Sequence, residues 1–301
     1  MVNFSHIIWS IWGLICDFYN LFKSPKIFVN GFFSRKGAIV LNSNWGDDIN
    51  VSLLSEYSDL RILPKNASRL YRLLPVKNYL CIGSVLGLYD NPKMEVWGSG
   101  LISAQKKVKQ PIGKIWSVRG PLTKQALISQ GIECPACFGD PALLVSRFYQ
   151  PKVIKKYKLG IIPHYKDENN PAISEFIKGR NDVKIVSMST YKNWRDIPNA
   201  VCSCEFIISS SLHGLIVSDS YGVPNVWAKF SEEITGGSFK FLDYFASVGR
   251  IVTSPVVISS SNDLAELQVC SEKFQVAEYI DFESIINACP FRKHLILLNN
   301  E

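Results

Sequence analysis

One pattern recurs along the sequence and constrains the fold more than any other: a short apolar run that ends in a loop containing glycine. Such runs occupy residues 38–41, 79–82, 95–97 and 115–118, and a helical pattern follows the last of them over 122–129. Short buried strands that alternate with helices are typical of a parallel sheet, whose loops gather at the carboxyl ends of the strands. The sequence therefore predicts an α/β fold.

A second series of the same kind begins at residue 158. It has predicted strands at 158–162, 183–186, 206–208 and 225–227. Before it lies a stretch with Pro, Lys and Arg residues, 146–157, that is typical of a linker. Two α/β units joined in this way would place a cleft between the carboxyl edges of their strands. We divide the chain into an N-terminal segment over 1–36 and two domains over 37–150 and 151–301, with a last helix that could pack back on the first domain.

Composition narrows the class of protein. Hydrophobic residues make up 47% of the chain and charged ones 20%, which excludes a disordered chain, a coiled coil and a collagen-like polymer. The net charge of +7 suits a phosphorylated substrate, an anionic membrane surface or nucleic acid, and does not choose among them. No run of like charges resembles a nucleic-acid-binding arm, and we expect no nucleic acid as a partner.

The eight cysteines include one C-x-x-C pair, Cys134 and Cys137, and one C-x-C pair, Cys202 and Cys204. These two pairs lie far apart in the sequence, whereas a zinc site usually draws on two closely spaced pairs. Pro135 and the turn that follows Cys137 do not suit a redox motif. We expect reduced, structural cysteines and no metal site.

The N-terminal stretch over residues 4–22 is strongly apolar but includes Asp17 and Asn20. No basic residue precedes it and no cleavage site of small residues follows, so we do not expect a secretory signal. Its uninterrupted apolar part is short for a membrane span. Two interpretations stay open: a helix packed on the first domain, or an interfacial helix with aromatic residues at the headgroup boundary and a basic flank beginning at Lys23.

Two loops of the first domain combine glycine with chemically useful side chains. In the loop over 44–50, Gly46 permits a tight turn where a helix begins, and free amides at a helix start suit an anion. Two adjacent carboxylates, Asp47 and Asp48, exceed what helix capping needs, so we expect one of them to be functional. Arg119 also joins a strand to a helix, where its two parallel donors can hold a phosphate or a carboxylate. Capping explains Asp140 nearly as well as substrate binding does.

The loop over 209–214 is the most informative one. Its three serines and backbone amides, at a predicted strand-to-helix junction, could cradle a phosphate. His213 stands at the helix start, where the helix dipole lowers the pKa of an imidazole. A capping or core histidine would explain the residue equally well. His164 has the same placement after an earlier strand, and downstream lie Lys229, Gly236, Gly237 and Lys240 in and around a glycine-rich segment.

Taken in order, these segments resemble the polysaccharide pyruvyltransferase family, and in particular its bacterial exopolysaccharide and capsule branch. The resembling segments are residues 44–50, 96–100, 118–123, 139–142, 161–164, 210–214, 221–224, 239–244 and 247–250. The resemblance covers about residues 37–250. It implies a GT-B-like fold, in which two Rossmann-like domains face a central cleft.

The resemblance also implies a function. Phosphoenolpyruvate would be the donor and a hydroxyl pair of a glycan, carried on a lipid, the acceptor; no cofactor or metal would be needed. The implied roles are His213 as acid and Arg119 with a lysine on the donor; Lys240 is our choice for this lysine, and Lys229 remains open. The chemistry also needs a base near the acceptor, and Asp47 could fill that role. Further substrate-binding residues would be Asn44, Gly46, Asp48, Asn50, Ser84, Asp140, His164, Ser210, Ser211, Gly214, Gly236 and Gly237.

Two rival functions fit the same fold. One is a nucleotide-sugar glycosyltransferase, and the other is a non-catalytic, glycan-binding subunit of a polysaccharide assembly complex. We expect a cytoplasmic protein, either free or in peripheral contact with the inner face of the cell membrane.

Overall fold

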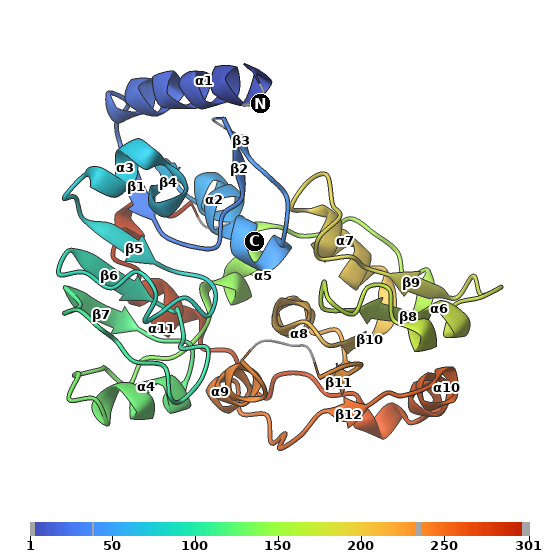
Figure 1. Ribbon diagram of the computed structural model, residues 1–301. Coiled ribbons are helices and arrows are strands. Elements are labelled where there is room, and N and C mark those ends of the chain that lie inside the picture. Colours follow the sequence, from blue (N-terminus) through green and yellow to red (C-terminus); the bar gives the residue numbers. More distant parts are fainter. Residues whose placement is uncertain (1–3, 38, 233–235, 297–301) are drawn as a thin grey trace.

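Two five-stranded parallel sheets lie side by side in the molecule, each covered by helices (Figure 1). This computed structural model describes residues 4–37, 39–232 and 236–296. The mixed α/β class predicted from the sequence is confirmed. The domain boundaries at residues 36 and 150 stay predictions, although the first sheet already begins within the segment 1–36.

The first sheet has the strand order β4-β1-β5-β6-β7. Three of its strands confirm the sequence prediction: β5 (Asn78–Leu80), β6 (Met94–Trp97) and β7 (Lys114–Ser117). The sequence analysis missed β1 (Lys26–Val29) and β4 (Arg61–Pro64), which pair with each other. The helices of this half are α2 (Trp45–Tyr57), α3 (Arg69–Leu73) and α4 (Pro121–Ile128), with the 3₁₀ turn η1 (Lys65–Ala67).

The prediction that residues 38–41 form a strand of this sheet is wrong. Residue 38 lies outside the described residues, and Ile39–Val40 (β3) pair antiparallel with Arg35–Lys36 (β2) in a separate hairpin. The side chain of Ile39 is 57% exposed. The strand beside β5 is β1, which is buried over three of its four residues.

The second sheet has the order β12-β11-β10-β8-β9 and confirms all four predicted strands of the second series. Its strands are β8 (Tyr157–Ile162), β9 (Val183–Ile185), β10 (Cys204–Ser209), β11 (Asn225–Lys229) and β12 (Val256–Val257). Its helices are α6 (Pro171–Phe176), α7 (Asp196–Cys202), α8 (Leu212–Ser220), α9 (Phe239–Ser247) and α10 (Ser261–Val269). A short connection, η2 (Pro141–Leu144) and α5 (Val145–Phe148), precedes β8.

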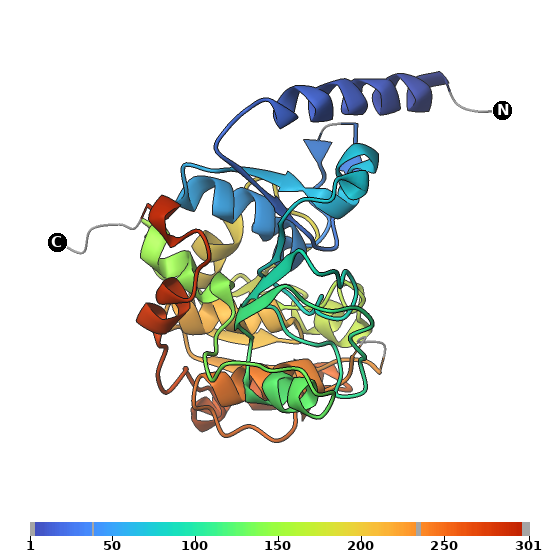
Figure 2. The same cartoon turned by 90° about the vertical axis from the view of Figure 1, so that its left-hand side faces the viewer.

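The chain returns to the first sheet near its end. After η3 (Ser271–Lys273), α11 (Phe282–Asn287) packs against that sheet, where the indole nitrogen of Trp97 at the end of β6 donates to the carbonyl of Ile285 at 2.8 Å. The last turn, η4 (Arg292–His294), leads into a β-bridge between Leu295 and Ser58. Figure 2 shows these segments running up the side of the molecule toward α2. The two halves therefore share one packed body.

The N-terminal helix α1 (Phe4–Leu21) lies across the outside of the first half, over α3 and the β2–β3 hairpin (Figures 1 and 2). Among the described residues, no helix combines the length and apolar character that crossing a bilayer requires.

Candidate active site

Loops that follow the strands of both sheets converge on one cavity of about 560 Å³. From the first sheet come Phe32 after β1, Ser84 after β5 and Ile102 after β6; from the second come His164 after β8 and His213 after β10. Its remaining lining residues are Ser34, Ser43, Asn44, Asp47, Leu88, Tyr165, Met188, Ser211, Leu212 and Lys240. Because the strands within each sheet are parallel, their carboxyl ends meet at one edge, and the cavity lies at that edge of both sheets.

The start of α2 separates the two adjacent carboxylates. Asp48 is buried, and its Oδ2 accepts hydrogen bonds from the amides of Ser43 and Asn44 at 2.6 and 2.9 Å and from the hydroxyl of Tyr191 at 2.8 Å. Asp47 lines the cavity and accepts from the side-chain amide of Asn44 at 2.5 Å. Asp48 thus fixes the loop, while Asp47 faces the space where a ligand would bind.

His213 lies in the first turn of α8, against the first turn of α2. A Cβ atom added at Gly46 would lie 1.9 Å from Nδ1 of His213, so only glycine allows this approach. The imidazole is largely buried, and its Nε2 has no hydrogen-bond partner within the described part of the chain. Burial, with the Lys240 and Arg119 cations, lowers the pKa of His213 to about 3. The free site therefore holds a neutral imidazole at neutral pH.

Asp140 does not line the cavity but lies next to the ring of His213. One oxygen, Oδ1, accepts from the amide of Ala142 at 3.0 Å and caps η2. The other, Oδ2, is buried without a partner among the described residues and lies 4.0 Å from Nε2 of His213. Burial raises the pKa of Asp140 to about 6. Asp140 therefore both caps a turn and stands ready to pair with a protonated His213.

The structure separates the two candidate lysines. Lys240 lines the cavity, where burial and the Arg119 cation lower its pKa to about 8, partly offset by Asp47. Lys229 lies in a different, small pocket with Gly237 and forms an ion pair with Glu232 at 2.5 Å. Only Lys240 is thus placed to touch a ligand in the cavity.

Arg119 does not line the cavity; it is fully buried behind Ser84. Its guanidinium donates to Oδ2 of Asp243 at 3.0 Å, to the Ser84 hydroxyl at 2.6 Å and to the carbonyl of Leu101 at 2.8 Å. Asp243 also accepts from the amide and the hydroxyl of Thr123. Asp243 thus ties the start of α4 to α9. The Arg119 cation acts on the cavity only through its bond to Ser84 and through its electric field.

The loop over residues 209–214 offers a ligand fewer hydroxyls than its sequence suggests. Ser209 donates to the carbonyls of Ile162 and Ser211, and Ser210 donates to Asp167 at 2.7 Å. Only Ser211, the N-cap residue of α8, lines the cavity. The Ser210 hydroxyl also accepts from the amide of His164 at 2.8 Å, which fixes the second histidine. Burial and Lys240 lower the pKa of His164 to about 4.

The remaining predicted residues support the cavity without lining it. Asn50 is buried and exchanges two hydrogen bonds with the backbone of Ile82, which joins α2 to the end of β5. A Cβ at Gly214 would lie 2.4 Å from the Ser209 hydroxyl, and one at Gly236 would lie 2.7 Å from the side chain of Ile102. These glycines therefore permit close packing beside the site.

Asp47 is the group of the cavity whose charge changes near neutral pH. Burial raises its pKa to about 7, and the neighbouring Asp48 adds to this, while the Asn44 hydrogen bond and Lys240 oppose it. Near neutral pH, the cavity thus combines an aspartate close to its pKa, two neutral histidines and one lysine cation. An acid, a base and a cation in one cavity suit proton transfer to and from an anionic substrate.

Gly46→Ala tests the contact between α2 and His213. The added methyl group would collide with a buried ring, and we expect a cost of roughly 1–3 kcal/mol in the free energy of unfolding, the usual range for overpacking. Denaturant unfolding measures this cost. In a His213→Ala background the ring is absent, so the same substitution should cost much less; equal costs in both backgrounds would contradict the contact.

The sequence analysis missed two kinds of site residue. Apolar walls such as Leu88, Ile102 and Met188 carry no chemical pattern that could single them out. Asp243, the partner of Arg119, lies within the segment 239–244 that contributed to the family resemblance, and this was the one available signal.

The structure contains eight free cysteines, and none of them lines the cavity. Within residues 4–37, 39–232 and 236–296, no group of three or more His, Cys, Asp or Glu side chains is arranged to hold a metal ion.

Comparison with known proteins agrees with the resemblance found in the sequence. Residues 114–228 match the family model "Polysaccharide pyruvyl transferase". The succinoglycan biosynthesis protein ExoV of Rhizobium meliloti is 27% identical over 224 residues, 69% of this chain and 62% of that protein. The uncharacterized protein L143 of Acanthamoeba polyphaga mimivirus is 29% identical over 175 residues, 56% of this chain and 59% of that one. The chain thus covers less than two thirds of the length of either relative.

Proposed function

We propose that this chain, which carries a polysaccharide pyruvyl transferase domain over residues 114–228, transfers the enolpyruvyl unit of phosphoenolpyruvate to a glycan as a pyruvate ketal. One observation supports this most: Lys240, His213 and Asp47 line one cavity at the carboxyl ends of the two parallel sheets. Within the proposal, this arrangement is a GT-B-like fold. The acceptor is a hydroxyl pair on a lipid-linked polysaccharide repeat unit, and no cofactor takes part.

The proposed chemistry needs one acid and one base. A proton passes from His213 to the methylene carbon of phosphoenolpyruvate and produces an oxocarbenium-like centre. A sugar hydroxyl attacks that centre, the bond from carbon to the phosphate oxygen breaks, and a second hydroxyl closes the ketal. Of the two hydroxyl protons released, one restores the acid and the other leaves on the phosphate. Asp47 is placed to accept the hydroxyl protons.

Binding of the donor would favour protonation of His213, the proposed acid. In the free site, burial and two cations hold His213 neutral. A bound anionic donor would offset those cations and raise the pKa of the imidazole, and Asp140 at 4.0 Å would stabilise the protonated ring. Lys240 would hold a donor charge directly, while Arg119 would act from behind Ser84. The acid would thus become protonated only when its substrate is present.

The function is tested by incubating the protein with phosphoenolpyruvate and a panel of lipid-linked or synthetic glycans. We expect phosphate release and a product heavier than the acceptor by one pyruvate less one water. A product that gains a whole sugar from a nucleotide sugar would identify a glycosyltransferase instead. Glycan binding without phosphate release would identify a binding subunit.

Lys240→Ala should weaken phosphoenolpyruvate binding at least tenfold, because it removes the cation that faces the cavity. Lys229→Ala is the matched control and should leave donor affinity nearly unchanged, since Lys229 lies in another pocket beside Glu232. Calorimetry measures both affinities. The reverse ranking would exchange the roles of the two lysines.

The same lysine gives a pH dependence. Its pKa of about 8 means that the Lys240 cation is present below pH 8 and is lost as the pH rises through that value. Donor affinity of the wild type should therefore fall above about pH 8, and this fall should be absent from Lys240→Ala. A fall of the same size in the variant would place the titrating group elsewhere.

A further inference from the structure

Helix α1 turns Asp17 and Asn20 toward the protein and most of its apolar side chains toward the outside. Ser10, Gly13, Asp17 and Asn20 recur at intervals of three and four residues, so they share one face of the helix. Gly13 lies so close to Gly37 that an added Cβ would be 2.9 Å from its carbonyl carbon. In an ordinary surface helix of a soluble domain, the faces are reversed.

The polar face is fixed by specific bonds. Asp17 is buried; it accepts from Arg35 Nη1 at 2.7 Å and from the Ser68 hydroxyl at 2.6 Å. Asn20 accepts from Arg61 at 2.8 Å. The single charged residue among the described residues of α1 is therefore neutralised at the protein side, which explains why an aspartate interrupts an apolar stretch.

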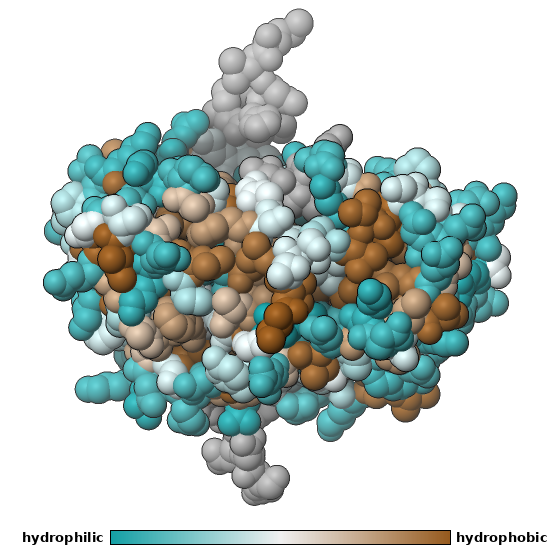
Figure 3. All heavy atoms as spheres, turned by 90° about the horizontal axis from the view of Figure 1, so that it is seen from below, coloured by the Kyte–Doolittle hydropathy of each residue, from teal (hydrophilic) through white to brown (hydrophobic). Residues whose placement is uncertain are grey.

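The outer face is a continuous apolar surface. Along α1 and the residue that follows it, seven large side chains that do not line the cavity beneath the helix are between 53% and 73% exposed: Ile8, Ile11, Trp12, Ile15, Phe18, Tyr19 and Phe22. Soluble monomers rarely leave so many neighbouring apolar residues uncovered. On the side away from α1, hydrophobic residues lie in separate patches among hydrophilic ones (Figure 3). We call this outer surface of α1 the apolar face.

The positive charge of the protein is concentrated in the segment that includes this helix and in the one whose helix packs against it. Residues 4–41 and 61–77 hold nine of the 33 Lys and Arg residues but only one of the 26 Asp and Glu residues, the neutralised Asp17. The rest of the chain holds 24 basic and 25 acidic residues, so these two segments account for the whole net charge of +7. The segment 61–77 includes α3, which packs against α1.

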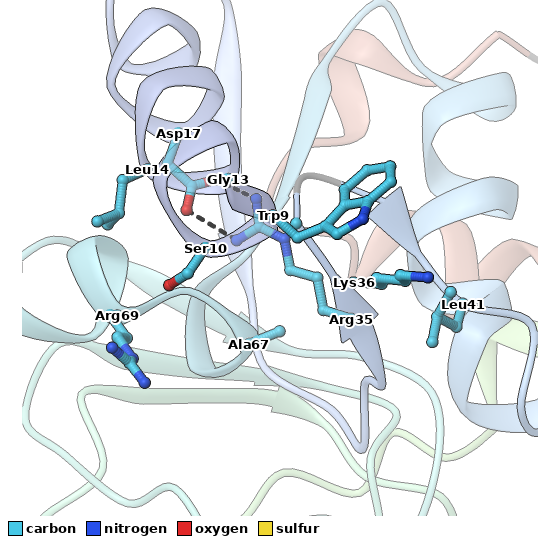
Figure 4. Close-up of a pocket in the computed structure, with 11 residues that line it drawn as sticks. Trp9, Ser10, Gly13, Leu14, Asp17, Arg35, Lys36, Leu41, Ala67 and Arg69 are labelled. Carbon is cyan, nitrogen blue, oxygen red and sulfur yellow. Dashed lines mark hydrogen bonds and ion pairs between the residues drawn. The ribbon is translucent and has the colours of Figure 1, made fainter. Parts of the chain in front are cut away.

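Some of these cations lie beside the aromatic residues of α1. A cavity of about 650 Å³ between α1 and the β2–β3 hairpin is lined by Trp9, Arg35, Lys36 and Arg69 (Figure 4). Lys36 lies 5.2 Å from the ring centre of Trp9, and Lys23 lies 4.8 Å from that of Tyr19. Aromatic rings next to Lys and Arg are the side chains that occupy the boundary between lipid tails and charged headgroups.

We propose that the apolar face of α1 lies in the surface of an anionic lipid bilayer, with the surrounding cations on the phosphate headgroups. Charge favours this partner over a second copy of the chain. A two-fold dimer would bring the same surface of both copies together, and with it two basic clusters. An anionic bilayer instead offers an apolar interior to the exposed side chains and negatively charged headgroups to the cations.

The membrane proposal stands independently of the chemistry in the cavity, but the two sites are connected. Phe32 and Ser34 line the catalytic cavity, whereas Arg35 and Lys36 line the cavity under α1. A bilayer seated on α1 would thus lie next to the wall of the candidate active site, where a lipid-linked acceptor would arrive.

The test is co-sedimentation of the full chain with lipid vesicles. We expect binding to vesicles of phosphatidylcholine mixed with phosphatidylglycerol, at least tenfold weaker binding to phosphatidylcholine alone, and a further loss at high salt. Ile15→Glu/Phe18→Glu should reduce binding to the anionic vesicles at least tenfold. Ile15→Leu/Phe18→Leu should retain it. Ile251→Glu, at a position 90% exposed between α9 and β12, is the matched control and should bind like the wild type.

Circular dichroism and thermal unfolding verify that each variant is folded, which we expect because the changed side chains are exposed. Light scattering measures the oligomeric state in parallel. A wild-type protein that binds neither kind of vesicle overturns the proposal. So does a dimer that the Glu variants convert to a monomer without any lipid binding, since the apolar face would then be a protein interface.

Discussion

His213→Gln should lower turnover roughly a hundredfold or more, the usual scale for removing a general acid, while donor affinity changes little. Glutamine preserves size and hydrogen bonding but cannot deliver a proton. The expectation rests on the position of the ring: it lines the cavity, its Nε2 has no partner among the described residues, and the Asp140 carboxylate lies 4.0 Å away. Phosphate release at saturating phosphoenolpyruvate measures the effect.

His164→Gln is the matched control for this prediction. His164 lines the same cavity, and burial also lowers its pKa, but its surroundings differ. Its backbone amide donates to the Ser210 hydroxyl, and its Nδ1 accepts from the backbone amide of Lys166 at 3.3 Å, so one ring nitrogen is already engaged. Its loss should cost less turnover. A dead His164→Gln beside a near-native His213→Gln would reverse the two roles.

A titration separates proton transfer from a purely structural role. In the free protein, the pKa of His213 is about 3, so its ring should stay neutral throughout the neutral range. Saturation with phosphoenolpyruvate should raise that pKa, which NMR of the histidine ring can follow. Asp140→Asn should reduce the rise, because it removes the charge that stabilises the protonated ring. An unchanged pKa in the complex would contradict acid catalysis by His213.

Arg119→Ala should destabilise the fold by about 3–5 kcal/mol, the scale for breaking a buried ion pair. The side chains of Arg119 and Asp243 are both fully buried and lie 2.9 Å apart. Truncating the arginine leaves the aspartate uncompensated and also removes the bonds to Ser84 and Leu101. Denaturant unfolding measures the loss.

The double variant Arg119→Met/Asp243→Leu distinguishes a structural from a donor-binding Arg119. It replaces the charge pair with apolar side chains and should recover much of the lost stability. If Arg119 served only the fold, phosphoenolpyruvate affinity would recover with it. If its field also attracts the donor, affinity should stay reduced in the stable double variant. Full stability in the single variant would contradict the buried pair.

Much of the site followed from the sequence because parallel strands bring their carboxyl ends together. His164, His213 and Lys240 each follow a strand of the second sheet, and Ser84 follows one of the first. Local pattern is enough to place such residues at one edge. The two missed strands, β1 and β4, are short, and β1 lies in a segment that the apolar N-terminus had separated from the first domain.

What the sequence could not provide was the pairing of side chains across the chain. Asp140 is equally a capping residue and the neighbour of a histidine, and only packing brings it to His213. Arg119 has the local pattern of an anion-binding residue, yet tertiary structure turns it toward Asp243 and away from the cavity. The sequence favours Lys240 without excluding Lys229, and the fold places the two lysines in different pockets.

The N-terminal helix shows the same division. Its sequence alone determined an apolar stretch with helical spacing, a central aspartate and a basic flank. Spacing defines two faces but does not say which one meets the protein. The tertiary structure decided that, because Arg35 and Ser68 bind Asp17 and draw the polar face inward. The apolar face points outward because the bonds from Arg35 and Ser68 compensate the desolvation of the Asp17 carboxylate at the protein side.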